Sequence, residues 1–247
     1  MSARSPVVAM VLAAGRGTRM RPLTDRRPKA LVQVAGEALV DHALDRLAAA
    51  GIARAVVNIH HHALMLEIHL AARARPPQTA LSDERAALLE TGGGVLKALP
   101  MLGSGPFVTL NGDAVWAGPE PVVALLAAWA REGAGLDALM LLVPRERAHG
   151  YSRPGDFFLD DGGRPRRRGE AGSAPYVYTG AQVMRPEAFR DVPEAQAGRA
   201  FSLNPVWDRA LAAGRLGAVV WDGDWVDVGT PAGIVEAERV LARRRPR

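Results

Sequence analysis

The sequence predicts an α/β fold built on a mixed, mostly parallel sheet that is flanked by helices. Residues 7–12 are six consecutive apolar residues, a run typical of a strand buried on both faces of a parallel sheet. Residues 41–50 then carry apolar side chains at helical spacing, and residues 55–59 form a second apolar run. Strand, helix and strand in this order predict a right-handed βαβ unit.

The later segments continue this alternation. Gly51 is expected to end the first helix, and Pro231 is expected in the first turn of the last one. Residues 156–163 predict a hairpin, and Thr179-Gly180 interrupts a strand. We expect further helices at residues 63–74, 95–99, 121–131, 206–213 and 232–243, and further strands at residues 31–34, 79–82, 107–110, 138–143 and 176–183. The 247 residues contain no repeat or linker, which favours one continuous domain.

The composition is that of a globular protein with a sizeable core. Hydrophobic residues make up 48% of the chain and charged residues 23%, which excludes a disordered chain. Cysteine is absent, so disulfides, thiolate metal sites and a cysteine nucleophile are excluded. No apolar run approaches the roughly 20 residues that span a bilayer, and no signal peptide is recognisable. We therefore expect a cytoplasmic protein without a membrane partner.

The net charge of +5 raises the question of a nucleic-acid partner. Arginines cluster at residues 164–168 and 243–247. Aromatic residues make up 5% of the chain and do not interleave with these clusters, as base stacking requires. A solvated loop and a C-terminal tail explain the clusters better, so no nucleic-acid partner is expected.

The loop after the first strand has the features of a polyphosphate site. Gly15 and Gly17 allow backbone N–H groups to close around an anion, and Arg16, Arg19 and Lys29 supply positive charge. The Walker pattern is excluded because Thr-Arg follows the second glycine, and the dinucleotide fingerprint lacks its third glycine.

A second glycine-rich stretch, Leu-Glu-Thr-Gly-Gly-Gly at residues 89–94, precedes a predicted helix. Glycines at a helix start let a ligand approach the backbone, and the free N–H groups there favour anions. Thr91 is a suitable partner for a ribose or base edge. A flexible turn would explain the glycines alone.

Two aspartates at predicted strand ends suggest a metal–phosphate site. Asp113 follows Asn111-Gly112 at the carboxyl end of one strand, and Asp227 precedes Gly229 near another, and ligands gather at such strand ends. Mg²⁺ prefers one or two carboxylates together with phosphate oxygens. A hairpin turn is the alternative for residues 111–113. His60, His61 and His62 are not expected to form a metal site, because consecutive side chains point in different directions.

Residues 12–24 together with Pro28-Lys29 resemble the signature of sugar-1-phosphate nucleotidyltransferases, Leu-Ala-Ala/Gly-Gly-x-Gly-Thr-Arg-Met/Leu-x-Pro-Leu-Thr followed by Pro-Lys. Further motifs at residues 89–94, 111–113, 179–180 and 225–230 follow in family order. Within the family the chain is most similar to short bacterial uridylyltransferases that act on N-acetylmuramic acid 1-phosphate. The resemblance implies a Rossmann-like nucleotidyltransferase fold with a small sugar-binding β arm. Its nucleotide-binding part would span residues 1–118 and its sugar-binding part residues 119–235, followed by a C-terminal helix at 232–243.

The resemblance also implies substrates, a cofactor and residue roles. A nucleoside triphosphate (UTP for the most similar relatives) and a sugar 1-phosphate would give a nucleotide-sugar and pyrophosphate, with Mg²⁺ held by Asp113 and Asp227. Arg19, Lys29 and Asp113 would be the catalytic residues. The nucleotide would contact Leu12, Ala13, Ala14, Gly15, Arg16, Gly17, Thr18, Arg19, Lys29, Glu90, Thr91, Gly92, Gly93 and Asn111. The sugar would contact Asn111, Gly155, Asp156, Glu170, Thr179, Gly180 and Asn204.

Departures from the family pattern leave alternatives open. Ala30 follows Lys29 where proline is usual, and Ala171 follows Glu170 where many relatives have lysine. An arginine from residues 166–168 would have to supply that missing contact to the sugar phosphate.

The alternative functions are a mannose-1-phosphate guanylyltransferase or other sugar nucleotidyltransferase, and an inactive nucleotide-sugar-binding regulatory subunit. The oligomeric state, monomer or homodimer, stays open.

Overall fold

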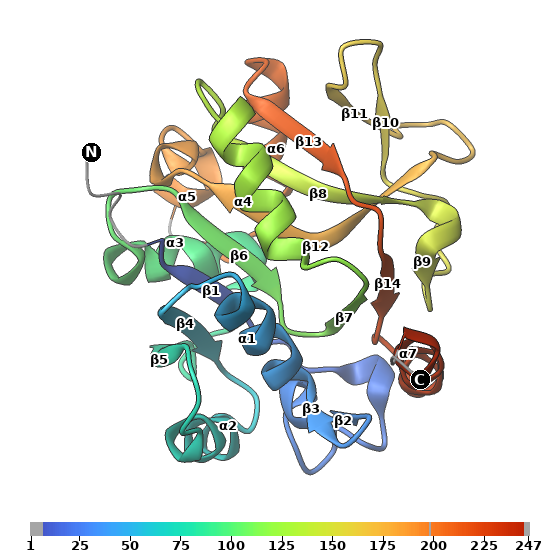
Figure 1. Ribbon diagram of the computed structural model, residues 1–247. Helices are drawn as coiled ribbons and strands as arrows, with labels where there is room; N and C mark the ends of the chain where they lie inside the picture. Colours follow the sequence, from blue (N-terminus) through green and yellow to red (C-terminus); the bar gives the residue numbers. More distant parts are fainter. Residues whose placement is uncertain (1–6, 198, 245–247) are drawn as a thin grey trace.

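The computed structural model describes residues 7–197 and 199–244 as alternating strands and helices (Figure 1). The strands are β1 (Ala9–Leu12), β2 (Gln33–Val34), β3 (Glu37–Ala38), β4 (Arg54–Ile59), β5 (Gln78–Asp83), β6 (Phe107–Asn111), β7 (Ala114–Ala117), β8 (Ala138–Pro144), β9 (Ala148–His149), β10 (Phe157–Leu159), β11 (Pro165–Arg167), β12 (Tyr176–Met184), β13 (Leu216–Val220) and β14 (Asp224–Asp227). The α-helices are α1 (Leu39–Ala49), α2 (Ala63–Ala72), α3 (Glu90–Leu102), α4 (Pro121–Glu132), α5 (Pro193–Gln196), α6 (Asn204–Ala212) and α7 (Pro231–Arg244). Short 3₁₀ helices are η1 (Thr18–Met20), η2 (Lys29–Leu31), η3 (Arg145–Arg147) and η4 (Pro186–Phe189).

A nine-stranded mixed sheet forms the centre of the fold and confirms the predicted fold class. Its order is β11-β10-β12-β6-β1-β4-β5, with β8 paired to β12 and β13 paired to β8. β1 lies parallel to both β4 and β6, and β4 lies parallel to β5. Leu12 stands opposite Asn111 in this register. The loops that follow β1 and β6 therefore leave the sheet at the same edge.

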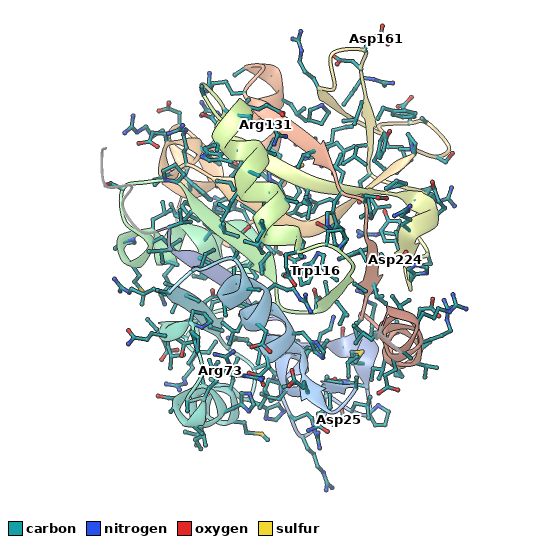
Figure 2. All side chains as sticks on the ribbon, in the orientation of Figure 1. Asp25, Arg73, Trp116, Arg131, Asp161 and Asp224 are labelled. Atoms are coloured by element: carbon teal, nitrogen blue, oxygen red, sulfur yellow. The ribbon has the colours of Figure 1, made fainter. Side chains whose placement is uncertain are left out.

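Helices cover both faces of this sheet. Ala9 and Val11 of β1 pack into one core cluster with residues of α1, α2 and α4, and this cluster also contains the buried Trp116 (Figure 2). Met10 lies between them in sequence and packs into a second cluster with residues of α3 and α6. In Figure 1, α1 and α4 lie on the face of the sheet toward the viewer. β1 is thus buried on both faces, as its unbroken apolar run predicts.

A smaller sheet, β7-β14-β9, carries the chain from the end of β6 to the C-terminal helix. β14 runs antiparallel to β7, with Asp227 opposite Ala114. The Val228 N–H donates to the carbonyl oxygen of Asp113 at 3.1 Å. This pairing places Asp113 and Asp227, which come from distant parts of the sequence, beside each other.

Several element boundaries differ from those predicted. α3 begins at Glu90, so the three glycines lie inside its first turns instead of preceding a helix at residues 95–99. Residues 31–34, predicted as one strand, divide between η2 and β2. β7 and β13 were not predicted. Gly51 follows α1 with a φ of +76°, the left-handed conformation expected of a helix-ending glycine.

No helix within the described part of the chain is long and apolar enough to cross a membrane.

The strand interruption predicted at Thr179-Gly180 is a shift of register within β12. The pairing of β12 with β8 shifts between Tyr178 and Gln182, and Gly180 has a φ of +80°. A Cβ atom at Gly180 would lie 2.8 Å from side-chain atoms of Asn111. The bulge therefore fits the central sheet against a residue at the end of β6.

We predict that Gly180→Ala lowers the free energy of unfolding by about 1–3 kcal/mol, because alanine is strained at this φ and its methyl group overlaps Asn111. Chemical denaturation followed by circular dichroism measures the change. Gly105→Ala is the matched control, since a Cβ there meets no atom within 4 Å, and it should alter stability by less than about 0.5 kcal/mol. Equal stability of the two variants would contradict this account of the bulge.

Candidate active site

A cleft of about 660 Å³ opens where β6, β14 and the β10–β11 arm meet. Its lining includes eight residues that the sequence predicted for the site, namely Arg19, Thr91, Asn111, Asp113, Gly155, Asp156, Asn204 and Asp227. These residues come from both the N-terminal and the C-terminal halves of the chain. The structure therefore brings most of the separate motifs into one cavity.

Lys29 and Asp113 form an ion pair at this cleft. The Lys29 Nζ lies 2.8 Å from Asp113 Oδ2, and the lysine side chain is only 10% exposed. Gly17 makes room for the lysine, because a Cβ at Gly17 would lie 2.9 Å from Lys29 Cβ. The Thr24 hydroxyl donates to the Gly17 carbonyl at 2.8 Å and fixes the turn. Gly17 thus serves in packing Lys29 as well as in the backbone turn, where its φ is +62°.

Asp227 lies beside this pair in a strongly charged environment. Burial, and then the negative charge of Asp113, raise the pKa of Asp227, while Lys29, Arg19 and Arg153 act in the opposite direction. The Arg19 guanidinium and the Asp227 carboxylate both lie against Gly229, because a Cβ there would be 2.8 Å from Arg19 Nη2 and 2.9 Å from Asp227 Oδ1. Neighbouring carboxylates of this kind have the oxygen donors that Mg²⁺ prefers, and phosphate oxygens could complete the shell.

The loop after β1 is anchored by a buried hydrogen-bond network that the sequence did not reveal. Asn58 Oδ1 accepts from the Ala13 N–H at 2.6 Å, and Asn58 Nδ2 donates to Glu84 Oε1 at 2.7 Å. Glu84 Oε2 accepts from the Leu89 N–H at 3.2 Å. Asn58 and Glu84 are both almost fully buried. In the sequence, the one signal for this network was Asn58, a polar residue inside the apolar run at 55–59.

Within that loop, Ala13 and Ala14 are buried, whereas Gly15, Arg16, Thr18 and Arg19 are exposed. A Cβ at Gly15 would meet no atom within 4 Å. The loop therefore presents open backbone and guanidinium groups at the edge of the sheet.

The glycine stretch that begins α3 does not have the free N–H groups that we expected. The N–H groups of Gly92 and Gly93 donate to the Phe201 carbonyl at 2.8 and 3.0 Å. A Cβ at Gly92 would lie 2.5 Å from both the Phe201 ring and the Ser202 carbonyl oxygen. The expectation was wrong because the chain's own residues 201–202, and not a ligand, make the close approach. Thr91 still lines the cleft, and its Oγ1 accepts from the Leu203 N–H at 3.0 Å.

Some residues predicted for the sugar lie at the cleft with their polar groups already engaged. Asp156 Oδ1 accepts from the Tyr151 hydroxyl at 2.8 Å, and Asp156 Oδ2 accepts from the Tyr178 N–H at 3.1 Å. Asn204 Oδ1 accepts from Arg167 at 3.0 Å. Burial, together with the charge of Asp156, raises the pKa of Tyr151, so this phenol stays a neutral donor.

Two predicted sugar contacts are not supported by the geometry. Thr179 is fully buried, and its hydroxyl donates to the Leu141 carbonyl at 2.9 Å, because the bulge in β12 turns this side chain into the sheet. Glu170 is exposed and is not part of the cleft lining. The cleft lining instead contains Arg153, which lies between β9 and β10, and Arg167 and Arg168 from the end of β11. Arg153 had no sequence signal beyond its position two residues before Gly155.

The consecutive histidines make separate contacts. His60 Nδ1 is 2.8 Å from the Glu84 carbonyl oxygen, and His62 Nε2 is 3.2 Å from the Asp25 carbonyl oxygen. Across residues 7–197 and 199–244, no group of three or more histidine, aspartate and glutamate side chains is arranged to bind a metal. A metal at the cleft would therefore depend on the Asp113–Asp227 pair and on oxygens from the substrates.

Comparison with known proteins identifies the family. The MobA-like NTP transferase domain matches residues 9–150. The chain belongs to this family. It is 45% identical to the N-acetylmuramate alpha-1-phosphate uridylyltransferase of Caulobacter vibrioides, over 97% of this chain and 98% of that protein. It is 36% identical to the enzyme of the same name from Neisseria meningitidis, over 93% of this chain and 96% of the relative.

The fold agrees with this membership. A structure of UDP-glucose pyrophosphorylase in complex with UDP-glucose superimposes with a TM-score of 0.77 and 15% identity, covering 98% of this chain and 100% of that one. This likeness concerns the fold alone. The protein is thus a nucleotidyltransferase with a Rossmann-like fold.

We predict that Asn58→Ala lowers the stability of this nucleotidyltransferase by about 2–4 kcal/mol, because it leaves the Ala13 N–H and the Oε1 atom of Glu84 buried without a partner. It should also raise the KM for the nucleotide, since the loop after β1 loses its anchor. Denaturation curves and initial rates measure the two effects. Gln78→Ala, an exposed position on the neighbouring β5, is the control, and a mild loss like that of the control would refute the anchoring role.

Proposed function

We propose that this nucleotidyltransferase moves the uridylyl group of UTP to N-acetylmuramic acid 1-phosphate, releasing pyrophosphate. The observation that carries the proposal is the Lys29–Asp113 ion pair beside Asp227 in a cleft lined with arginines. The nearly full-length similarity to two enzymes named N-acetylmuramate alpha-1-phosphate uridylyltransferase supports the choice of substrates.

The chemistry requires positioning and positive charge more than a general base. A phosphate oxygen of the sugar 1-phosphate is already anionic at neutral pH, so it can attack the α-phosphorus without first losing a proton. As the new P–O bond forms, the bond between the α-phosphorus and the bridging oxygen breaks, and pyrophosphate leaves. The protein must hold two polyanions together and stabilise the charge that develops between them.

The residues of the cleft divide this work. Lys29 would contact the α-phosphate and the attacking phosphate, and Arg19 would bind the departing pyrophosphate. Asp113 and Asp227 would hold Mg²⁺, which when bound neutralises phosphate charge. These two carboxylates fit the ion because they lie together, and within the described part of the chain the Asp227 carboxylate makes no hydrogen bond or ion pair.

The remaining predicted contacts also find places in this scheme. The exposed part of the loop at residues 12–18 would surround the triphosphate, and Glu90 and Thr91 would lie against the nucleoside. Asn111, Gly155, Asp156, Gly180 and Asn204 would form the sugar side. Thr179 has no side-chain role here, because its hydroxyl is buried.

A matrix of nucleoside triphosphates against sugar 1-phosphates tests the substrates, with pyrophosphate release as the readout. UTP with N-acetylmuramic acid 1-phosphate should give the highest kcat/KM. A higher value with GTP and mannose 1-phosphate would replace the proposed substrates. An absence of turnover in every combination would instead favour a binding subunit.

We predict that Asp113→Ala and Lys29→Ala each lower kcat by about 10²–10³-fold or more, because each removes a charge that acts on the reacting phosphates. Circular dichroism should show that both variants are folded. Lys97→Ala is a matched control, since Lys97 is the other lysine of the chain and lies exposed on α3. Folded variants at Lys29 or Asp113 that keep near-normal turnover would contradict the assignment.

A further inference from the structure

Arg153 differs from Arg167 and Arg168, the other two arginines of residues 145–170 that line the cleft, because its guanidinium is not already bonded. Across residues 7–197 and 199–244, the Arg153 guanidinium makes no hydrogen bond or ion pair, although it lines the cleft. Arg167, by contrast, forms an ion pair with Asp208 and donates to Asn204. Arg168 donates to the Ala171 carbonyl at 2.6 Å. An unpaired cation at the wall of a cleft is available to an anionic ligand.

Aromatic packing holds Arg153 in place. Its guanidinium lies over the Tyr151 ring, with Cζ 4.9 Å from the centroid, and such stacking orients a guanidinium without neutralising it. Tyr151 packs edge-on against Trp225 at 6.0 Å and donates its hydroxyl to Asp156. Because Trp225 and Asp227 belong to the same short strand, Arg153 is tied to the strand that carries a proposed metal ligand.

Arg153 comes from a different part of the chain than the other cations near Asp227. Arg19 belongs to η1 and Lys29 to η2, both in the N-terminal half, whereas Arg153 lies between β9 and β10. The positive charge of each of the three side chains lowers the pKa of Asp227. Gly150, near the start of the loop that carries Arg153, packs so tightly that a Cβ there would lie 2.7 Å from the Asp227 carbonyl oxygen. The carboxylate of Asp227 is therefore surrounded by cations from both halves of the chain.

The two groups of cations suit different substrates. Arg19 and the loop after β1 would face the nucleotide, and Lys29 already shares its charge with Asp113. Beside Gly155 and Asp156, Arg167 is paired with Asp208 and Arg168 is hydrogen-bonded to the Ala171 carbonyl, so Arg153 has the guanidinium that a second phosphate group could bind without displacing an existing bond. We propose that Arg153 binds the phosphate of the acceptor sugar 1-phosphate and directs it toward the α-phosphorus. This inference rests on the proposed function.

The test compares Arg153→Gln and Arg153→Lys with Arg166→Gln. Arg166 is a matched control because it stacks on Phe158 with Cζ 4.6 Å from the ring centroid but does not line the cleft. Arg153→Gln should raise the KM for N-acetylmuramic acid 1-phosphate by about 10- to 100-fold, as expected for the loss of a charged hydrogen bond. The KM for UTP should change less than about 3-fold. Arg153→Lys should recover part of the loss, and Arg166→Gln should resemble the wild type.

Other outcomes would overturn the assignment in distinguishable ways. An unchanged acceptor KM removes Arg153 from the site, and an equal or larger rise in the KM for UTP places it with the nucleotide. A rise for N-acetylmuramic acid 1-phosphate but not for N-acetylglucosamine 1-phosphate would show that Arg153 binds the lactyl carboxylate instead of the phosphate. If the wild-type enzyme turns over only a different sugar 1-phosphate, the proposed sugar is wrong. The KM for that acceptor would then be compared between the wild type and Arg153→Gln to test the role of Arg153. No turnover with any acceptor would overturn both proposals.

Discussion

Two carboxylates held side by side by strand pairing are the constraint on which the site depends. The antiparallel register of β7 and β14 places Asp227 next to Asp113, and the Val228 N–H bond to Asp113 locks that register. Like charges at close range repel each other, and burial of Asp227 adds to the cost. Positive charge must offset this repulsion, which explains why Lys29 is packed against Asp113 and why further cations surround the pair.

The arginines of this chain differ in whether a carboxylate neutralises their charge. Arg73, labelled in Figure 2, is 5% exposed and bonds to both Asp41 and Asp45, and Arg167 is paired with Asp208. Arg19 and Arg153, in contrast, have no carboxylate partner within 4 Å in the described part of the chain. The arginines that are paired with carboxylates thus stabilise the fold, whereas Arg19 and Arg153 keep their charge available for polyanionic substrates.

The sequence predicted the parts of the site that depend on local pattern. The apolar runs located the central strands, and Asp113 and Asp227 were expected at strand ends, where the structure places them. The errors arose where distant segments meet. The Gly92 and Gly93 N–H groups are occupied by Phe201, and the direction of the Thr179 hydroxyl follows from a change of register in β12. Arg153 escaped notice because its importance depends on Tyr151 and Trp225, which come together only in the folded chain.

Direct observation of a divalent ion between the two aspartates tests this account most sharply. Crystals grown with Mn²⁺ and a non-hydrolysable UTP analogue should show an anomalous peak coordinated by Asp113, Asp227 and phosphate oxygens, with the triphosphate along residues 15–19. Asp227→Ala crystals, grown identically, should lose the peak or show it greatly weakened. A metal bound elsewhere, or a nucleotide outside the cleft, would contradict the claim that this carboxylate pair organises the active site.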